Sequence, residues 1–179
     1  MAGEENMNKI RPHKLKNIEY ELHLLFGADL IITEIEKNDT VINEDRNRFG
    51  NIINYFKDSI YLHTRNLFNL LTNEGLTEIG NIPKIQSETY KTWKKSIERY
   101  VMHLDQARDQ KGNSNVINNK HLNNQTHLFT DEIKYLVKLW IKGTEKKNKA
   151  KIEKIYSKAE RNANNDLARF KKLFENKRL

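Results

Sequence analysis

Apolar residues recur along most of the chain at intervals of three and four positions, with polar residues between them. This spacing places apolar side chains on one side of an α-helix, whereas a half-buried strand would alternate them with polar ones at every second position. Only two prolines and seven glycines interrupt the pattern. The sequence therefore predicts an all-α protein, an antiparallel bundle of four to five helices that ends in a long, basic, amphipathic C-terminal helix.

The helix with the clearest one-sided apolar stripe is predicted over residues 49–71, and we expect it to be the central core helix. A preceding helix over residues 15–37 has a similar stripe, which Gly27 weakens in the middle. Ser87 is a candidate N-cap for a third helix. The five predicted helices span residues 15–37, 49–71, 87–104, 130–143 and 144–179.

Three parts are expected along the chain: a mobile N-terminal segment over residues 1–14, a helical bundle over 15–143, and the basic C-terminal helix over 144–179. Residues 109–129 are rich in asparagine and poor in apolar side chains, so we expect a long loop there. Loops of this length in compact domains are usually functional or disordered.

The net charge of +8 lies entirely in the last 38 residues, 142–179, where 13 lysines and arginines stand against 5 acidic residues. Residues 1–141 carry 19 charges of each sign and are formally neutral. This segregation predicts a neutral body with a cationic arm. Such arms usually meet nucleic acid, anionic lipid or an acidic protein surface.

The cations of the arm form a stripe roughly opposite its apolar residues when the segment is wound as a helix. The stripe consists of Lys147, Lys151, Lys154, Lys158, Arg161, Arg169 and Lys172. The alternative is a solvated face produced by a lysine- and asparagine-rich composition, against which the neutral body argues. If five or six of these residues contacted phosphates, affinity would fall by roughly two to three decades between 50 and 200 mM salt. A membrane is the less favoured partner, because the apolar face lacks Trp and includes Ala159 and Ala163.

Several kinds of site are absent from the sequence. No cysteine is present, which excludes disulfides, thiolate metal sites and cysteine nucleophiles. A glycine-rich phosphate loop, a G-x-S-x-G elbow and an H-E-x-x-H pair are also lacking. No apolar run approaches the roughly 20 residues that a membrane-spanning helix needs. We therefore expect a cytoplasmic protein without a cofactor, a metal ion or a membrane partner. Glu19 and His23 lie one helical turn apart, and we interpret this pair as a surface salt bridge.

Two short segments on predicted helices carry candidate chemistry. In the first, His63 falls on the apolar stripe and is followed closely by Arg65 and Asn66. Polar groups beside a core seam cost free energy unless they are paired. If these residues are structural, we expect the imidazole to bond to a carbonyl oxygen and Arg65 to bond to a helix end or a carboxylate. If they are functional, we expect them to support a site.

In the second segment, Arg99 and His103 lie four residues apart and project from one side of a helix. A guanidinium can hold phosphate oxygens in a bidentate fork, and an imidazole can exchange a proton near neutral pH. Together they could support RNA transesterification, in which the ribose 2′-hydroxyl attacks its own phosphate without a metal ion. The alternative is an ordinary exposed helix face.

The two segments, within residues 50–108, read SIYLHTRNLFNLL and SIERYVMHLDQAR. They resemble the HEPN (higher eukaryotes and prokaryotes nucleotide-binding) superfamily of small helical bundles. The likeness is closest to its abortive-infection-like bacterial branch, which pairs an H-x-R-N-L helix with a later helix ending in x-H-L.

The resemblance implies a homodimeric bundle that acts as a metal-independent endoribonuclease in a bacterial or phage defence or toxin–antitoxin system. It implies that His103 is the general acid and base and that Arg99 holds the phosphate. Supporting roles would fall to His63, Arg65 and Asn66.

The family's signature places four to six residues between Arg and His, whereas three separate them here. Glu98 also stands where a polar neutral or basic residue is expected. A second hypothesis therefore stays open: a catalytically inactive module that binds RNA, a nucleotide or an acidic protein partner. A third is a purely structural helical adaptor.

Overall fold

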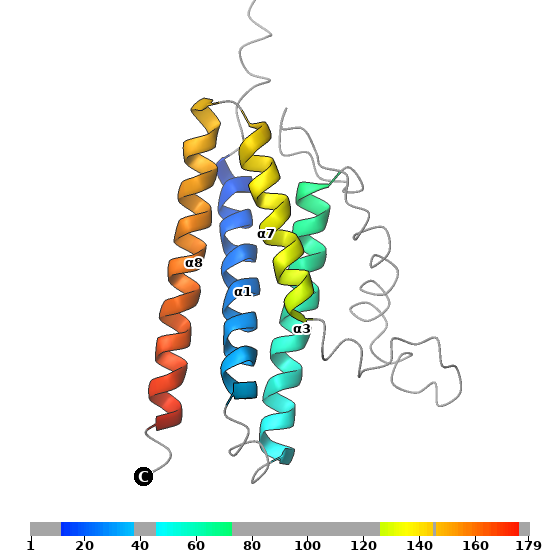
Figure 1. Cartoon of the computed structure of the whole chain (residues 1–179), viewed down its shortest axis with the longest axis vertical. Coiled ribbons are helices and arrows are strands. Elements are labelled where there is room, and N and C mark those ends of the chain that lie inside the picture. The colour runs from blue at the N-terminus through cyan, green and yellow to red at the C-terminus, as the bar shows by residue number, and fades with distance from the viewer. Residues whose placement is uncertain (1–11, 38–45, 73–125, 145, 176–179) are drawn as a thin grey trace, which may run out of the picture.

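The computed structural model describes residues 12–37, 46–72, 126–144 and 146–175. They form four long helices that pack as an all-α bundle (Figure 1). The helices are α1 (Pro12–Lys37), α3 (Arg46–Leu71), α7 (Thr126–Gly143) and α8 (Lys146–Glu175). The predicted all-α fold is confirmed, and each of the four helices corresponds to one expected from the apolar spacing.

Helices α1 and α8 run parallel to each other, and α3 and α7 run antiparallel to them (Figure 1). The ion pairs between α1 and α8 follow the same order along both helices, with Glu19 opposite Lys158 and Glu34 opposite Lys171. A very short turn joins α7 to α8. At this turn the hydroxyl of Thr144 donates to the carbonyl oxygen of Trp140 over 2.7 Å, which satisfies a carbonyl at the end of α7.

Helix α1 is the central element, because it packs more extensively than any other described helix, chiefly against α8 and α3 and also against α7. The expectation that residues 49–71 form the central helix is therefore wrong. Helix α3 carries a one-sided apolar stripe because it buries one side, whereas α1 buries residues around most of its circumference. The buried apolar residues of α1 are Ile18, Leu22, Leu25, Phe26, Ala28, Ile31, Ile32 and Ile35.

Helix α8 is an integral part of the bundle and not a detached arm. Its apolar stripe lies against α1, and the side chains of Ile152, Ala159 and Ala163 are fully buried. Gly27 of α1 faces this contact, since a Cβ placed on it would lie 4.0 Å from the Cα of Ala163. Small residues on both helices allow their backbones to approach closely at this point.

Three predicted parts of the chain lie wholly or partly outside the described residues, and the expected mobile segment over 1–14 is described only from Pro12, where α1 begins. The expected helix over residues 87–104 is one of them, as is most of the expected loop over 109–129. Helix α7 begins at Thr126, four residues before the predicted start at Thr130, so the last part of the expected loop is helical.

Candidate nucleic-acid interface

The side of α8 that lies roughly opposite its buried residues is strongly cationic. With about 100° between successive residues, the seven predicted stripe positions fall within an arc of about 80°, roughly opposite the buried residues Ile152, Ala159 and Ala163. We call this arc the outer face of α8. It consists of Lys147, Lys151, Lys154, Lys158, Arg161, Arg169 and Lys172.

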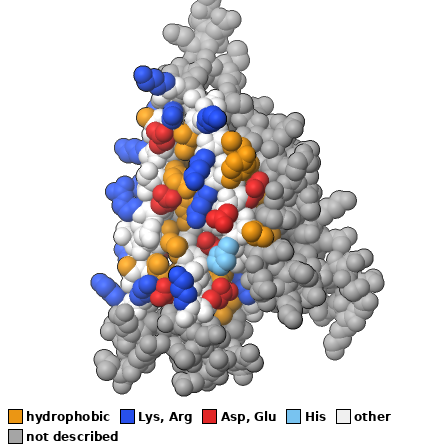
Figure 2. Space-filling view, in the orientation of Figure 1, with side chains coloured by type: hydrophobic (Ala, Val, Ile, Leu, Met, Phe, Trp, Pro, Cys, Tyr) orange, Lys and Arg blue, Asp and Glu red, His pale blue; other side chains and the backbone are white. Residues whose placement is uncertain are grey.

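Four cations of the outer face are exposed and have no ion-pair partner among the described residues. Figure 2 shows lysine and arginine side chains along the left-hand edge of the molecule, where α8 lies. The four are Lys151, Lys154, Arg161 and Lys172. For Lys147 the structure describes only its place in α8.

Two other cations of the outer face contact carboxylates. The Nζ of Lys158 lies 2.6 Å from Oε1 of Glu19 on α1, so this side chain joins the two helices. The guanidinium of Arg169 lies 3.5 Å from Oδ1 of Asp166, one turn earlier on α8. Arg169 is still 80% exposed, so most of its side chain stays accessible to a ligand.

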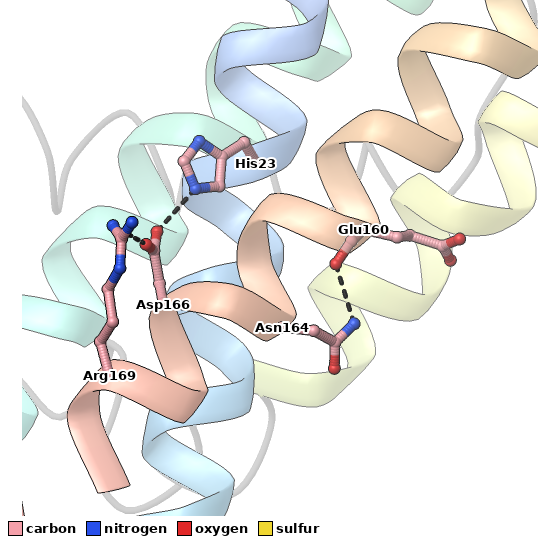
Figure 3. Close-up of polar contacts among 5 residues, drawn as sticks. All are labelled: His23, Glu160, Asn164, Asp166 and Arg169. Carbon is pink, nitrogen blue, oxygen red and sulfur yellow. Dashed lines mark hydrogen bonds and ion pairs between the residues drawn. The ribbon is translucent and has the colours of Figure 1, made fainter. Parts of the chain in front are cut away.

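Asp166 is shared between α1 and the outer face. Its Oδ2 lies 2.6 Å from Nε2 of His23, and its other oxygen faces Arg169 (Figure 3). The expected salt bridge between Glu19 and His23 is therefore wrong, because each of these residues pairs with α8 instead. Both interactions hold α8 against α1.

The acidic residues of α8 lie away from its outer face. Between Lys147 and Lys172 they are Glu153, Glu160 and Asp166. Glu153 pairs with Lys149 at 3.9 Å, on a flank of the helix. Glu160 accepts a hydrogen bond from Tyr156; burial, and then this contact, raise the pKa of the Tyr156 phenol above its ordinary value of 10.0.

Figure 3 shows Glu160 and Asn164 on the flank of α8 opposite Asp166. Here the amide of Asn164 donates to the backbone carbonyl oxygen of Glu160 over 2.8 Å. No carboxylate of α8 thus lies within the arc of the outer face, and Asp166 reaches Arg169 from its flank.

A second polar cluster joins α3 to α1. The Oε2 of Glu21 lies 2.6 Å from Nδ1 of His63 and accepts a hydrogen bond from the amide of Asn66 over 3.0 Å. The side chains of Glu21 and His63 are 15% and 9% exposed. The acceptor of the His63 imidazole is thus a carboxylate from a neighbouring helix and not a carbonyl oxygen.

Arg65 does not join this cluster. It follows His63 by two residues, which turns it about 200° around α3, to the other side of the helix. Its Nε atom is buried and has no hydrogen-bond partner within the described ranges. The structure thus brings His63 and Asn66 together and separates Arg65 from them.

The two predicted catalytic residues, Arg99 and His103, lie outside the described residues. Their geometry and their relation to His63 stay predictions. In the part of the chain that the structure describes, no group of three or more His, Cys, Asp or Glu residues could hold a metal ion. No helix within the same ranges is long and apolar enough to cross a bilayer.

The described chain thus belongs to the class of all-α helical bundles, with one cationic helix face. No family model, curated protein or solved structure matches it. The resemblance to the HEPN superfamily is therefore supported only at the level of an all-helical bundle.

Sequence reasoning missed the acidic residues of α1 as partners. Glu19, Glu21 and Glu34 reach Lys158, His63 and Lys171, and Asp29 reaches His127 at 2.8 Å. The sequence does contain one pattern that indicates these contacts. Acidic residues recur along α1 between its apolar positions, and a central helix directs them at its neighbours' cations.

Proposed function

We propose that the protein binds nucleic acid, RNA in the first place, along the outer face of α8. The observation that carries the proposal is the set of exposed cations Lys151, Lys154, Arg161 and Lys172, which have no ion-pair partner among the described residues. Between Lys147 and Lys172, α8 is about 37 Å long at about 1.5 Å per residue. A straight row of like charges complements the regular phosphates of a polynucleotide.

The position of the apolar residues on α8 argues for nucleic acid over a membrane. An interfacial helix inserts its apolar face into the lipid. In α8 that face is already used, because Ile152, Ala159 and Ala163 are buried against the bundle. The outer face offers charge without apolar anchors, which suits phosphate contacts that carry no base readout.

Binding can be tested by fluorescence anisotropy with a labelled RNA, across a range of salt concentrations. Four phosphate contacts predict an affinity loss of about 50-fold between 50 and 200 mM salt for a single strand. Two competitors of equal charge are compared with unlabelled RNA. One is a preparation of vesicles that contain anionic lipid, and the other is a polyglutamate peptide. Displacement of RNA by either competitor as effectively as by unlabelled RNA, or binding that does not depend on salt, would contradict the proposal.

Metal-independent RNA cleavage is the second candidate function, and it rests on the resemblance to the HEPN superfamily. Arg99 would hold the phosphate and His103 would move the proton as the 2′-oxygen attacks and the 5′-oxygen leaves. A contact in the bundle supports a catalytic context: Glu21 fixes the imidazole of His63 on α3 over 2.6 Å. A carboxylate that orients an imidazole is a common arrangement in acid–base sites. In this hypothesis the protein acts as a homodimer in a defence or toxin system.

The cleavage hypothesis predicts that purified protein degrades RNA in EDTA and leaves 2′,3′-cyclic phosphate ends. His103→Ala should abolish the activity, and His121→Ala, a histidine in the asparagine-rich segment, should retain it. Light scattering would show whether the active species is a dimer. If the wild type binds RNA but never cleaves it, the protein is the inactive binding module.

A further inference from the structure

Tyr20 is a large exposed ring on the central helix. Its residue is 59% exposed, although α1 otherwise buries its large apolar side chains on several sides. Its place in the bundle follows from its two neighbours in sequence. Glu19 reaches Lys158 of α8, and Glu21 reaches His63 of α3. Because successive residues are about 100° apart, Tyr20 projects outward between α8 and α3.

Two cations, one on α8 and one on α1, are connected to the position of Tyr20. The pair between Glu19 and Lys158 links this level of α1 directly to the outer face of α8. Lys16 precedes Tyr20 by one helical turn, so the two side chains are neighbours on α1. Lys16 is exposed, and no described residue forms an ion pair with it.

The ring of Tyr20 also makes an aromatic contact that favours one orientation. It contacts the imidazole of His63 edge to face, with the ring centroids 6.2 Å apart and the planes at 84°. The imidazole is in turn held by Glu21 at 2.6 Å. A ring whose orientation is fixed before binding loses less conformational freedom when a ligand stacks on it.

We propose that Tyr20 is a stacking platform for an unpaired base of a single-stranded nucleic acid whose backbone lies on the outer face of α8. The inference rests on the proposed function and narrows its ligand from nucleic acid in general to a single strand. Single-strand binders combine a positively charged track with aromatic rings on which bases stack. The bases of a duplex are already stacked on one another, so a duplex would meet only the cations.

The test compares a single-stranded RNA of about 12 nucleotides with the duplex of the same sequence. Anisotropy is measured for wild type, Tyr20→Leu, Tyr20→Phe and the control Tyr55→Leu, which removes a ring from α3 that is 74% exposed. We expect Tyr20→Leu to weaken single-strand binding about 5- to 100-fold. Duplex binding should be unchanged, and Tyr20→Phe and Tyr55→Leu should stay within about 2-fold of wild type.

The failure of this inference differs from the failure of the proposed function. If Tyr20→Leu binds the single strand like wild type, or weakens both ligands equally, the platform is refuted while binding on α8 stands. If neutralising the outer face of α8 leaves RNA binding intact, the proposed function itself fails. Cross-linking of wild-type protein to a 5-bromouridine strand needs no variant. We expect an adduct on Tyr20, and adducts confined to α8 would contradict the platform.

Discussion

The Nζ atom of Lys158 lies 2.6 Å from Oε1 of Glu19, so one cation of the outer face of α8 fastens that helix to α1. Lys171 makes a similar contact with Glu34 at 3.0 Å, from a flank of α8. The basic helix therefore has two sets of cations: those that hold it in the bundle and those that face solvent without a described partner. Substitutions can therefore be made in one set of cations without changing the other, and the effects on RNA binding can be compared.

Glu19→Gln should release Lys158 for a ligand. The Lys158 side chain is 52% exposed, and exposed ion pairs of this kind contribute about 0–1 kcal/mol, so the fold should be almost unaffected. One additional phosphate contact should steepen the salt dependence of RNA binding by about 0.7 in the log–log slope and raise affinity several-fold at low salt. An unchanged slope in the anisotropy titration would show that Lys158 plays no part in binding.

Glu21→Ala should destabilise the bundle by about 2–3 kcal/mol, because it leaves the imidazole of His63 and the amide of Asn66 without their acceptor in a mostly buried place. Urea unfolding followed by circular dichroism measures the change. Glu19→Ala is the matched control on the same helix and should cost less than about 1 kcal/mol. Equal losses of stability in the two variants would mean that the contacts of Glu21 with His63 and Asn66 stabilise the fold no more than the contact of Glu19 does.

Gly27→Ala should stabilise the protein by about 0.5–1 kcal/mol, since alanine favours the helix interior and the new methyl group meets Ala163 at an ordinary contact distance of 4.0 Å. Ala163→Leu should have the opposite effect and cost about 1–3 kcal/mol by overpacking the same contact. Thermal unfolding of both variants and of wild type measures these changes in stability. A loss of stability in Gly27→Ala would show that the two helices are closer than described.

Lys57 on α3 is buried, and burial lowers the pKa of its ammonium group below 10.5, although the charge of Glu36 partly opposes the shift. Between the lowered value and 10.5 the unfolded chain binds more protons, so stability rises with pH in this window. Lys57→Met lacks this titration, so it should gain stability relative to wild type as the pH falls from 10.5 through the window. This advantage should shrink as the pH approaches 10.5 in urea titrations, and an advantage independent of pH would contradict the assignment.

The sequence predicts the outer face of α8 well because a helical period and a run of lysines are both local properties. It does not predict which cations are used within the fold. Glu19 and Lys158 are 139 positions apart in the chain, and His23 and Asp166 are 143 apart. Only the packing of α1 on α8 brings these pairs together.

The central helix was missed for a related reason. A one-sided stripe, as in α3, is the easiest pattern to recognise, yet it marks a helix with one buried side. Helix α1 buries Phe26, Ala28 and Ile31 on different sides, which blurs its stripe. Gly27 in its middle reads as a weakness in the sequence, although it lies at the close contact with Ala163.

Two variants of identical net charge test whether RNA binding depends on the outer-face cations that have no ion-pair partner among the described residues. One replaces with glutamine four exposed cations of the outer face that lack an ion pair among the described residues: Lys151, Lys154, Arg161 and Lys172. The other replaces four exposed lysines elsewhere that lack an ion pair among the described residues: Lys37, Lys138, Lys142 and Lys146.

RNA affinity by anisotropy at 50 mM salt is the measurement. With both variants folded, we predict that the RNA affinity of the first variant falls about 100-fold or more and that most of its salt dependence is lost. The RNA affinity of the second variant should stay within several-fold of wild type. Equal losses in the two variants would mean that net charge alone drives binding and that the outer face of α8 is not the site.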